Sequence, residues 1–187
     1  MIPTNVVMLS LGLRRGELLG LSWKDVDLDG REVNIRRALP ARRPGMPLEL
    51  SKPKSGSQRR LLIPDEVVAA LKAHRSRQAT ERMKLGPAWT DSGLVFTTES
   101  GDLIDPRNFH RAMSTISRRA GLGHWHPHEL RHSAASIMLA QGVPLEVVSE
   151  VLGHASIKMT KDVYGHLIGS QKREAADAMG KALWGST

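Results

Sequence analysis

The chain has 187 residues, enough for one domain with a sizeable hydrophobic core. It has no cysteine, which excludes disulfides and suits a cytoplasmic protein, and no apolar run of the roughly 18 residues that a transmembrane helix needs. The 27 Lys and Arg outnumber the 19 Asp and Glu, and this net charge of +8 favours a polyanionic partner. Aromatic residues make up only 4%, so duplex DNA fits better than a single strand stacked on aromatic rings.

The first part of the chain predicts two helices followed by a small sheet. A helix should end at Gly12, and apolar residues at helical spacing predict a short second helix over 15–21. Apolar residues on both sides of Asp29-Gly30 predict a β-hairpin over 26–35. Two more short strands are expected at 48–50 and 60–63, on either side of a polar turn.

The remainder of the chain predicts helices. Pro64 and the acidic residues after it should begin a helix that runs to about Arg82, and 94–97 should be extended. Prolines and glycines bound the later helices, which we expect over 105–121, 127–141, 144–153, 156–168 and 171–183. We therefore expect one domain over 1–187, mainly α with a small three-stranded antiparallel β-sheet (α+β).

Reactive side chains occur at five places along the chain. They are Arg14 in the segment Gly12–Leu18, the turn lysines Lys52 and Lys54, the segment His128–His132, the segment Leu152–His154, and Tyr164. Each place alone is weak evidence for a reactive site. An arginine after the end of a helix or a lysine in a turn is usually solvated, and a histidine after glycine usually satisfies helix-end carbonyls. Their joint order is what points to chemistry, and Tyr164 is the only tyrosine in the chain.

Together these motifs resemble the tyrosine recombinase, or phage integrase, family from Gly12 to about Gly169. The most specific stretch is Pro-His-Glu-Leu-Arg-His at 127–132, followed by the segment 143–154 that ends in Leu-Gly-His and by Tyr-Gly-His at 164–166. The resemblance implies a catalytic domain with the DNA breaking-rejoining fold. It also implies a function in site-specific DNA recombination or integration of a mobile genetic element, encoded by a bacterium or a phage.

The resemblance assigns a role to each reactive residue. Those that it implies to be catalytic are Arg14, Lys54, His128, Arg131, His154 and the nucleophile Tyr164. Two fixed guanidiniums neutralise the anionic phosphodiester and stabilise the additional charge of its transition state. The phenol, with a pKa near 10, must lose its proton in the attack, a histidine can exchange protons at neutral pH, and a lysine can protonate the departing 5′ oxygen. The product is a 3′-phosphotyrosyl bond, and the scheme needs no metal or other cofactor. For the lysine, Lys54 is preferred to Lys52.

Basic pairs and an apolar stripe indicate partners. Paired arginines suit phosphate contact because guanidinium is a planar, bidentate donor, and we expect double-stranded DNA to be bound by Arg15, Arg36, Arg37, Arg42, Arg43, Arg59 and Arg60. A stripe near the end of the chain packs either on its own core or on a neighbouring subunit, as in a tetramer on DNA. It consists of Ala175, Ala176, Met179, Ala182, Leu183 and Trp184.

The N-terminal side departs from the usual pattern of the family. Family members usually carry an N-terminal DNA-clamping domain, and their catalytic domain begins with an additional helix. Only 13 residues precede Arg14, so we expect both the first helix and the core-binding domain to be missing from this chain. The non-catalytic alternative is a remnant of an integrase that binds DNA without cutting it.

A second alternative uses the same residues as a zinc metallopeptidase. His128-Glu129-x-x-His132 matches H-E-x-x-H, in which two histidines on one helical face bind zinc, and Glu146 or Glu150 would supply a third ligand. Pro127 places His128 in the first helical turn, which speaks against this site. In the recombinase interpretation Glu129 faces the helix dipole and His132 is a buried, hydrogen-bonded histidine that supports the site. Type IB topoisomerases use a similar active site, but the spacing here is more like that of integrases.

Overall fold

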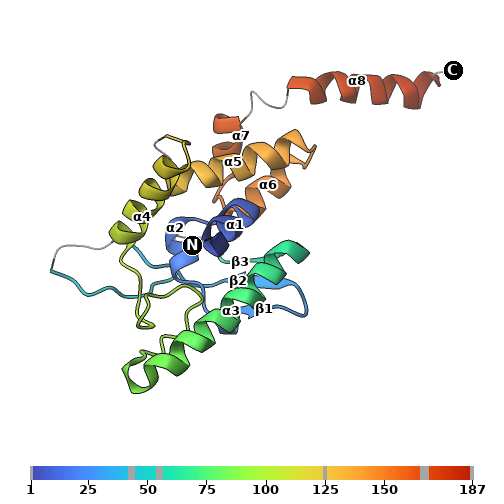
Figure 1. Ribbon diagram of the computed structural model, residues 1–187. Helices are drawn as coiled ribbons and strands as arrows, with labels where there is room; N and C mark the ends of the chain where they lie inside the picture. The colour runs from blue at the N-terminus through green and yellow to red at the C-terminus, as the bar shows by residue number, and fades with distance from the viewer. Residues whose placement is uncertain (1, 42–44, 54–56, 124–125, 165–168, 186–187) are drawn as a thin grey trace.

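The computed structural model describes residues 2–41, 45–53, 57–123, 126–164 and 169–185. Figure 1 shows a mainly helical chain with one small sheet, which confirms the expected fold class. The helices are α1 (Ile2–Leu11), α2 (Arg15–Leu19), α3 (Asp65–Leu85), α4 (Pro106–Arg119), α5 (Pro127–Ala140), α6 (Leu145–Leu152), α7 (Ile157–Tyr164) and α8 (Gly169–Trp184). The strands are β1 (Val26–Asp27), β2 (Glu32–Ile35) and β3 (Arg59–Leu62).

The three strands form an antiparallel sheet in the order β1-β2-β3. The predicted hairpin is present: Val26 pairs with Val33, and the Asp27 carboxylate accepts hydrogen bonds from the backbone N–H groups of Asp29 and Gly30 at 3.1 and 2.8 Å. The predicted strand at 48–50 is wrong. Leu48 and Leu50 pack their apolar side chains against the core, but their backbone joins no strand, and only an isolated bridge between Ser51 and Ala38 lies beside them. Core packing, and not strand pairing, accounts for the apolar pattern there.

The core lies where α1 and α2 meet the sheet and α3. Met8, Leu18, Val33 and Leu71 are fully buried within it. A second, smaller cluster joins α5, α6 and α7, and α1 contacts both α3 and α5 (Figure 1). The segment from α1 to α2, which contains Arg14, therefore lies at the junction of the two halves.

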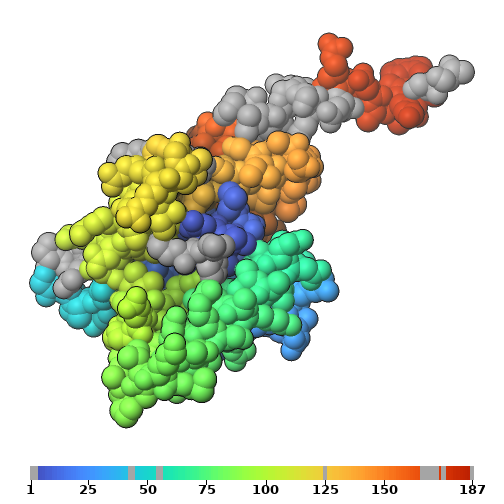
Figure 2. All heavy atoms as spheres, in the orientation of Figure 1, coloured from blue at the N-terminus to red at the C-terminus, as the bar shows by residue number. Residues whose placement is uncertain are grey.

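Helix α8 extends away from the rest of the chain (Figures 1 and 2). Met179, Leu183 and Trp184 are 58%, 60% and 78% exposed. The interpretation in which this stripe packs on the chain's own core is therefore wrong for these residues, and Ala176 and Ala182 are exposed as well. Among the described residues, no helix has both the length and the apolar character to cross a membrane.

Candidate active site

Arg14 is positioned by the tight connection between α1 and α2. Gly12 has a φ of +57°, in the left-handed region, and a Cβ at this position would lie only 2.6 Å from Cδ2 of Leu152. Arg14 then caps α2, because its backbone N–H donates to Glu17 Oε2 at 3.0 Å and its Nη1 donates to Glu17 Oε1 at 2.9 Å. The local sequence Gly-Leu-Arg-Arg-Gly-Glu thus fixes both the backbone and the guanidinium of Arg14.

Three guanidiniums meet at the C-terminal end of α6. The Leu152 carbonyl also accepts Nη1 of Arg14 at 3.4 Å, and each of three consecutive carbonyls there accepts one shorter hydrogen bond from a different arginine. The pairs are Arg59 Nε with Val151 at 2.6 Å, Arg131 Nη2 with Leu152 at 2.6 Å, and Arg14 Nη2 with Gly153 at 2.9 Å. The last carbonyls of a helix lack partners within the helix and form its negative pole, so they bind cations well. The backbone of α6 therefore gathers residues that lie far apart in the sequence.

Arg131 is more enclosed than Arg14, the other predicted phosphate-binding arginine. The residue is 7% exposed, and its Nη1 donates to the carbonyl of Gly12 at 2.6 Å. Burial, together with the positive charge of Arg14, lowers its pKa to about 10. It still carries a full charge at neutral pH, in a place where water screens that charge poorly.

Arg59 does not lie where the sequence predicted. It was expected to bind DNA, but its side chain is only 6% exposed, and its Nη1 and Nη2 donate to Glu17 at 3.2 and 3.0 Å. This prediction is wrong, because the guanidinium faces the interior. Burial raises the pKa of Glu17, but the hydrogen bonds and charge of Arg59 and the hydrogen bonds of Arg14 outweigh it, so the pKa lies below its ordinary value. Glu17 is a buried anion that the motif analysis did not single out.

The two predicted phosphate-binding histidines both have lowered pKa values. His154 follows α6 directly, and its Nδ1 lies 2.7 Å from Oγ1 of Thr160. Burial and the charges of Arg131 and Arg14 lower the pKa of His154 to about 4. Burial also lowers the pKa of His128, helped by His132 and Arg131. Because neighbouring positive charge depresses these pKa values, an anion bound among the arginines would raise them.

Tyr164 ends α7 and is 5% exposed. Its ring packs in the smaller cluster with Ala135, Val148 and Leu152, and its hydroxyl is hydrogen-bonded to Nδ1 of His132. Burial raises the pKa of Tyr164, with the charge of Arg131 acting in the opposite direction. The predicted hydrogen bond of His132 is thus present, but His132 is exposed and not buried.

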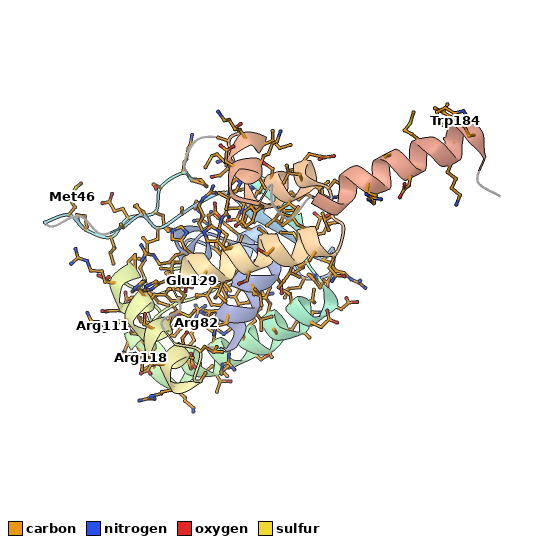
Figure 3. All side chains as sticks on the ribbon, turned by 90° about the horizontal axis from the view of Figure 1, so that it is seen from above. Met46, Arg82, Arg111, Arg118, Glu129 and Trp184 are labelled. Carbon is orange, nitrogen blue, oxygen red and sulfur yellow. The ribbon has the colours of Figure 1, made fainter. Side chains whose placement is uncertain are left out.

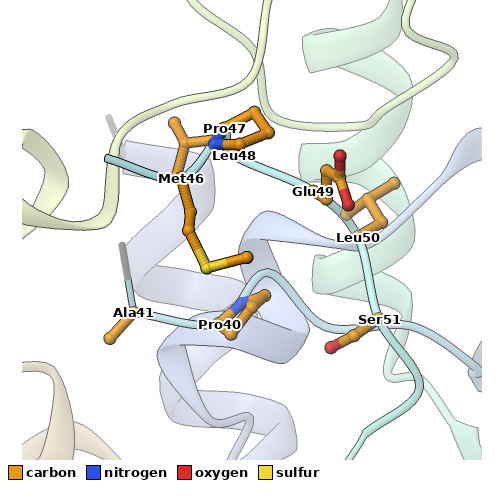
Figure 4. Close-up of a pocket in the computed structure, with 8 residues that line it drawn as sticks. All are labelled: Pro40, Ala41, Met46, Pro47, Leu48, Glu49, Leu50 and Ser51. Atoms are coloured by element: carbon orange, nitrogen blue, oxygen red, sulfur yellow. The ribbon is translucent and has the colours of Figure 1, made fainter. Parts of the chain in front are cut away.

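A groove of about 650 Å³ connects several predicted residues. Arg14, Arg15, Lys52 and His128 line it. Lys54, Arg42 and Arg43 lie outside the described residues. A smaller pocket of about 320 Å³ adjoins the groove, and Figure 4 shows Met46 extending toward Pro40 on its wall.

Three other predicted arginines are paired with acidic side chains. Arg37 and Arg36 lie 3.0 and 3.8 Å from the buried Asp25 carboxylate, and Arg60 pairs with Glu32 across the sheet. The side chains of Arg36 and Arg60 are both 65% exposed, so they still reach solvent. Arg37 is more enclosed, at 27%.

The residues of the H-E-x-x-H sequence have other partners. Glu129 lies in the first turn of its helix, as the recombinase interpretation expected, and its carboxylate accepts a hydrogen bond from the backbone N–H of His126 and so caps that helix. His132 contacts Tyr164. Within the part of the chain that the structure describes, no three acidic, histidine or cysteine residues come together as metal ligands. These contacts do not favour the zinc peptidase alternative.

Comparison with known proteins bears on this arrangement. The model of the phage integrase family matches residues 5–170. The chain belongs to the phage integrase family. It is 36% identical to a XerC-like tyrosine recombinase of Caldanaerobacter subterraneus, over 90% of this chain but only 46% of that protein. The chain thus spans about half the length of the curated relatives it matches.

Two solved structures show the same fold. The crystal structure of XerA recombinase superposes with a TM-score of 0.68 and 27% identity, covering 94% of this chain and 57% of that one. The Tn1549 transposon integrase in complex with transposon right end DNA gives a TM-score of 0.77 at 20% identity, covering 97% and 58%. The match therefore extends over both halves of the fold that meet at Arg14.

Proposed function

We propose that this chain is the catalytic part of a site-specific DNA recombinase or integrase, in which Tyr164 attacks a DNA phosphodiester. One observation carries the proposal. The end of α6 holds Arg14 and Arg131 by successive carbonyls, while Leu152 of the same turn belongs to the small hydrophobic cluster that contains Tyr164. A phosphate bound by the two guanidiniums would thus lie on the segment that also supports the nucleophile.

The reaction follows from these groups. The Tyr164 oxygen forms a bond to phosphorus, the bond to the 5′ oxygen breaks, and the product is a 3′-phosphotyrosyl ester. Arg14 and Arg131 stabilise the charge of the transition state, since preorganised donors act more strongly in an enclosed site than in water. The phenolic proton passes to Nδ1 of His132 along their hydrogen bond, and Lys54 is the proposed proton donor to the departing oxygen. Attack by a 5′ hydroxyl of another strand then reverses the step.

Duplex DNA would lie over the groove lined by Arg14, Lys52 and His128. Helix α4 borders this groove through His110, and it carries four exposed arginines. They are Arg107, Arg111, Arg118 and Arg119, of which Figure 3 labels Arg111 and Arg118. The Tn1549 integrase was solved with DNA, which supports the same partner here. A protein that acts on bacterial or phage DNA would work in the cytoplasm.

Covalent trapping tests the proposal. A nicked duplex lets the short fragment beyond the cut diffuse away, so that a phosphotyrosyl adduct accumulates. We expect the chain to form an adduct on a pool of nicked duplexes of random sequence, and Tyr164→Phe to bind the same duplexes without forming any. An adduct in Tyr164→Phe would refute the nucleophile. Saturated binding without an adduct in the unchanged chain would leave only the DNA-binding alternative.

We also propose that α8 binds a neighbouring copy on DNA. Its exposed Met179, Leu183 and Trp184 lie far from the body of the chain, as Figure 3 shows for Trp184. Exposed apolar groups of this kind mark interaction surfaces. Analytical ultracentrifugation of the protein–DNA complex should show a tetramer, and Leu183→Glu should form complexes with fewer subunits. An unchanged assembly in that variant would contradict the assignment.

A further inference from the structure

Glu17 joins two arginines in the interior of the site. Its carboxylate accepts Nη1 of Arg14 at 2.9 Å, and Nη1 and Nη2 of Arg59 at 3.2 and 3.0 Å. The side chains of Glu17 and Arg59 are 1% and 6% exposed, whereas that of Arg14 is 29% exposed. Arg14 thus reaches furthest toward solvent, Glu17 lies enclosed at the wall of the groove, and Arg59 lies behind them.

Such a cluster is not explained by stability. The cost of removing charges from water offsets most of their attraction, and apolar side chains of similar volume often stabilise a fold as well as a buried Arg–Glu–Arg set does. What the ion cluster provides, and an apolar cluster does not, is a fixed direction for each guanidinium.

We propose that Arg59 is a positioning residue, which fixes the guanidinium of Arg14 through Glu17 and also fixes the turn that holds Arg131 and His154. This inference rests on the proposed function, since it concerns the same site. Arg59 acts through other residues and need not touch the DNA.

The contacts of Arg59 tie three elements together. From β3 its guanidinium reaches Glu17 on α2, while its Nε donates to the carbonyl of Val151 on α6 at 2.6 Å. A Cβ on Gly153 would lie 2.7 Å from Nη1 of Arg59, so the turn rests directly on the guanidinium. A further bond from Nη1 to the carbonyl of Ser57, at 2.9 Å, holds the strand end. Lysine, a single point charge, cannot make these bonds together.

The expected effect is on the rate and not on the affinity for DNA. A misplacement of about 1 Å in a reacting group can cost about 10²-fold in rate. Because Arg14 neutralises the scissile phosphate, the effect of Arg59 should also depend on the charge of that phosphate.

The test compares Arg59→Lys with Arg82→Lys, a matched change at an exposed arginine that pairs with Asp91 at 3.0 Å. Single-turnover adduct formation, DNA affinity and Tm are measured on nicked duplexes with an ordinary phosphate or an uncharged methylphosphonate at the scissile position. We expect Arg59→Lys to bind DNA normally and to react about 10²-fold more slowly on the phosphate. Most of that deficit should disappear on the methylphosphonate, and Arg82→Lys should react normally on both.

A second variant separates positioning from folding. The double variant Glu17→Leu/Arg59→Met removes both charges of this pair, so we expect it to lose less Tm than Arg59→Met alone and to remain slow on the ordinary phosphate. Three results would overturn the proposal: a normal rate for Arg59→Lys, an equal deficit on both substrates, or a loss of rate that follows loss of Tm and binding.

A measurement without DNA distinguishes this proposal from the proposed function. In ¹⁵N NMR spectra, hindered rotation of the Arg14 guanidinium should give separate Nη signals in the unchanged chain and merged signals in Arg59→Lys. Absence of any adduct in the unchanged chain would refute the recombinase proposal alone. Equal Arg14 signals in both proteins would refute the role of Arg59 alone.

Discussion

Replacing Gly153 with alanine should damage the site without altering any reactive side chain. Gly153 has φ +65° and ψ 49°, and this left-handed conformation costs a non-glycine residue about 1–2 kcal/mol. The added Cβ would also lie 2.7 Å from Nη1 and 3.0 Å from Cζ of Arg59. Moving that guanidinium sacrifices at least one charged hydrogen bond, worth about 1.5–3 kcal/mol. We therefore expect Gly153→Ala to lower the free energy of unfolding by about 2.5–5 kcal/mol, because the two costs add.

Gly142 provides the control, since its φ is +78° but a Cβ there would meet nothing within 4 Å. Gly142→Ala should lose only the conformational part, about 1–2 kcal/mol, and should form the covalent adduct normally. In a domain of this size about 1 kcal/mol lowers Tm by roughly 2–4 °C, so calorimetry resolves the difference. If both variants lose the same stability and the same activity, the contact between Gly153 and Arg59 does not hold the turn.

Four further predictions concern the same site. Arg131→Ala should slow adduct formation by at least about 10²–10³-fold, and a near-normal rate would remove Arg131 from the site. His132→Asn keeps an acceptor for the Tyr164 hydroxyl but no base, so adduct formation should slow about 10²-fold and lose part of its pH dependence; an unchanged pH–rate profile would exclude proton transfer to His132. The pKa of His154 is about 4 in the folded chain and near 6.5 in the unfolded chain, so the unfolded chain binds the proton more readily. The contribution of neutral His154 to stability should therefore be complete above about pH 6.5 and be lost as the pH falls toward 4. Urea unfolding between pH 7.5 and 4 should show this loss, and His154→Gln should reduce it. DNA affinity should fall steeply with salt, and a flat dependence measured by fluorescence anisotropy would contradict binding through phosphates.

Residues that end helices or form turns made most of the fold predictable. Prolines and glycines bound the helices that follow Pro64, and Asp29-Gly30 marks the hairpin because its backbone N–H groups bond to Asp27. The strand expected at 48–50 failed for a different reason. Apolar side chains in a loop that packs on the core give the same pattern as a short strand, and only the partners of the backbone separate the two.

The two arginines at the start of β3 show which part of the site was not predicted from the sequence. Treated as a pair, Arg59 and Arg60 were both assigned to DNA. Successive residues of a strand point to opposite faces, so one of them had to turn inward, and this signal was present in the sequence. Glu17, the partner of Arg59, lies 42 residues away in the sequence, and no local pattern indicates a contact over that separation.

The Leu-Gly-His motif at 152–154 owes its importance as much to its backbone as to its histidine. The carbonyls of Val151, Leu152 and Gly153 together hold three guanidiniums, and the left-handed turn at Gly153 leaves them directed at the site. Side-chain chemistry read from the sequence assigns the motif one function, phosphate contact by His154. The helix end adds a second one, since its negative pole keeps Arg59, Arg131 and Arg14 close together despite their mutual repulsion. A substitution that preserves His154 but alters the last turn of α6 should therefore impair the arginines first, and the histidine only through them.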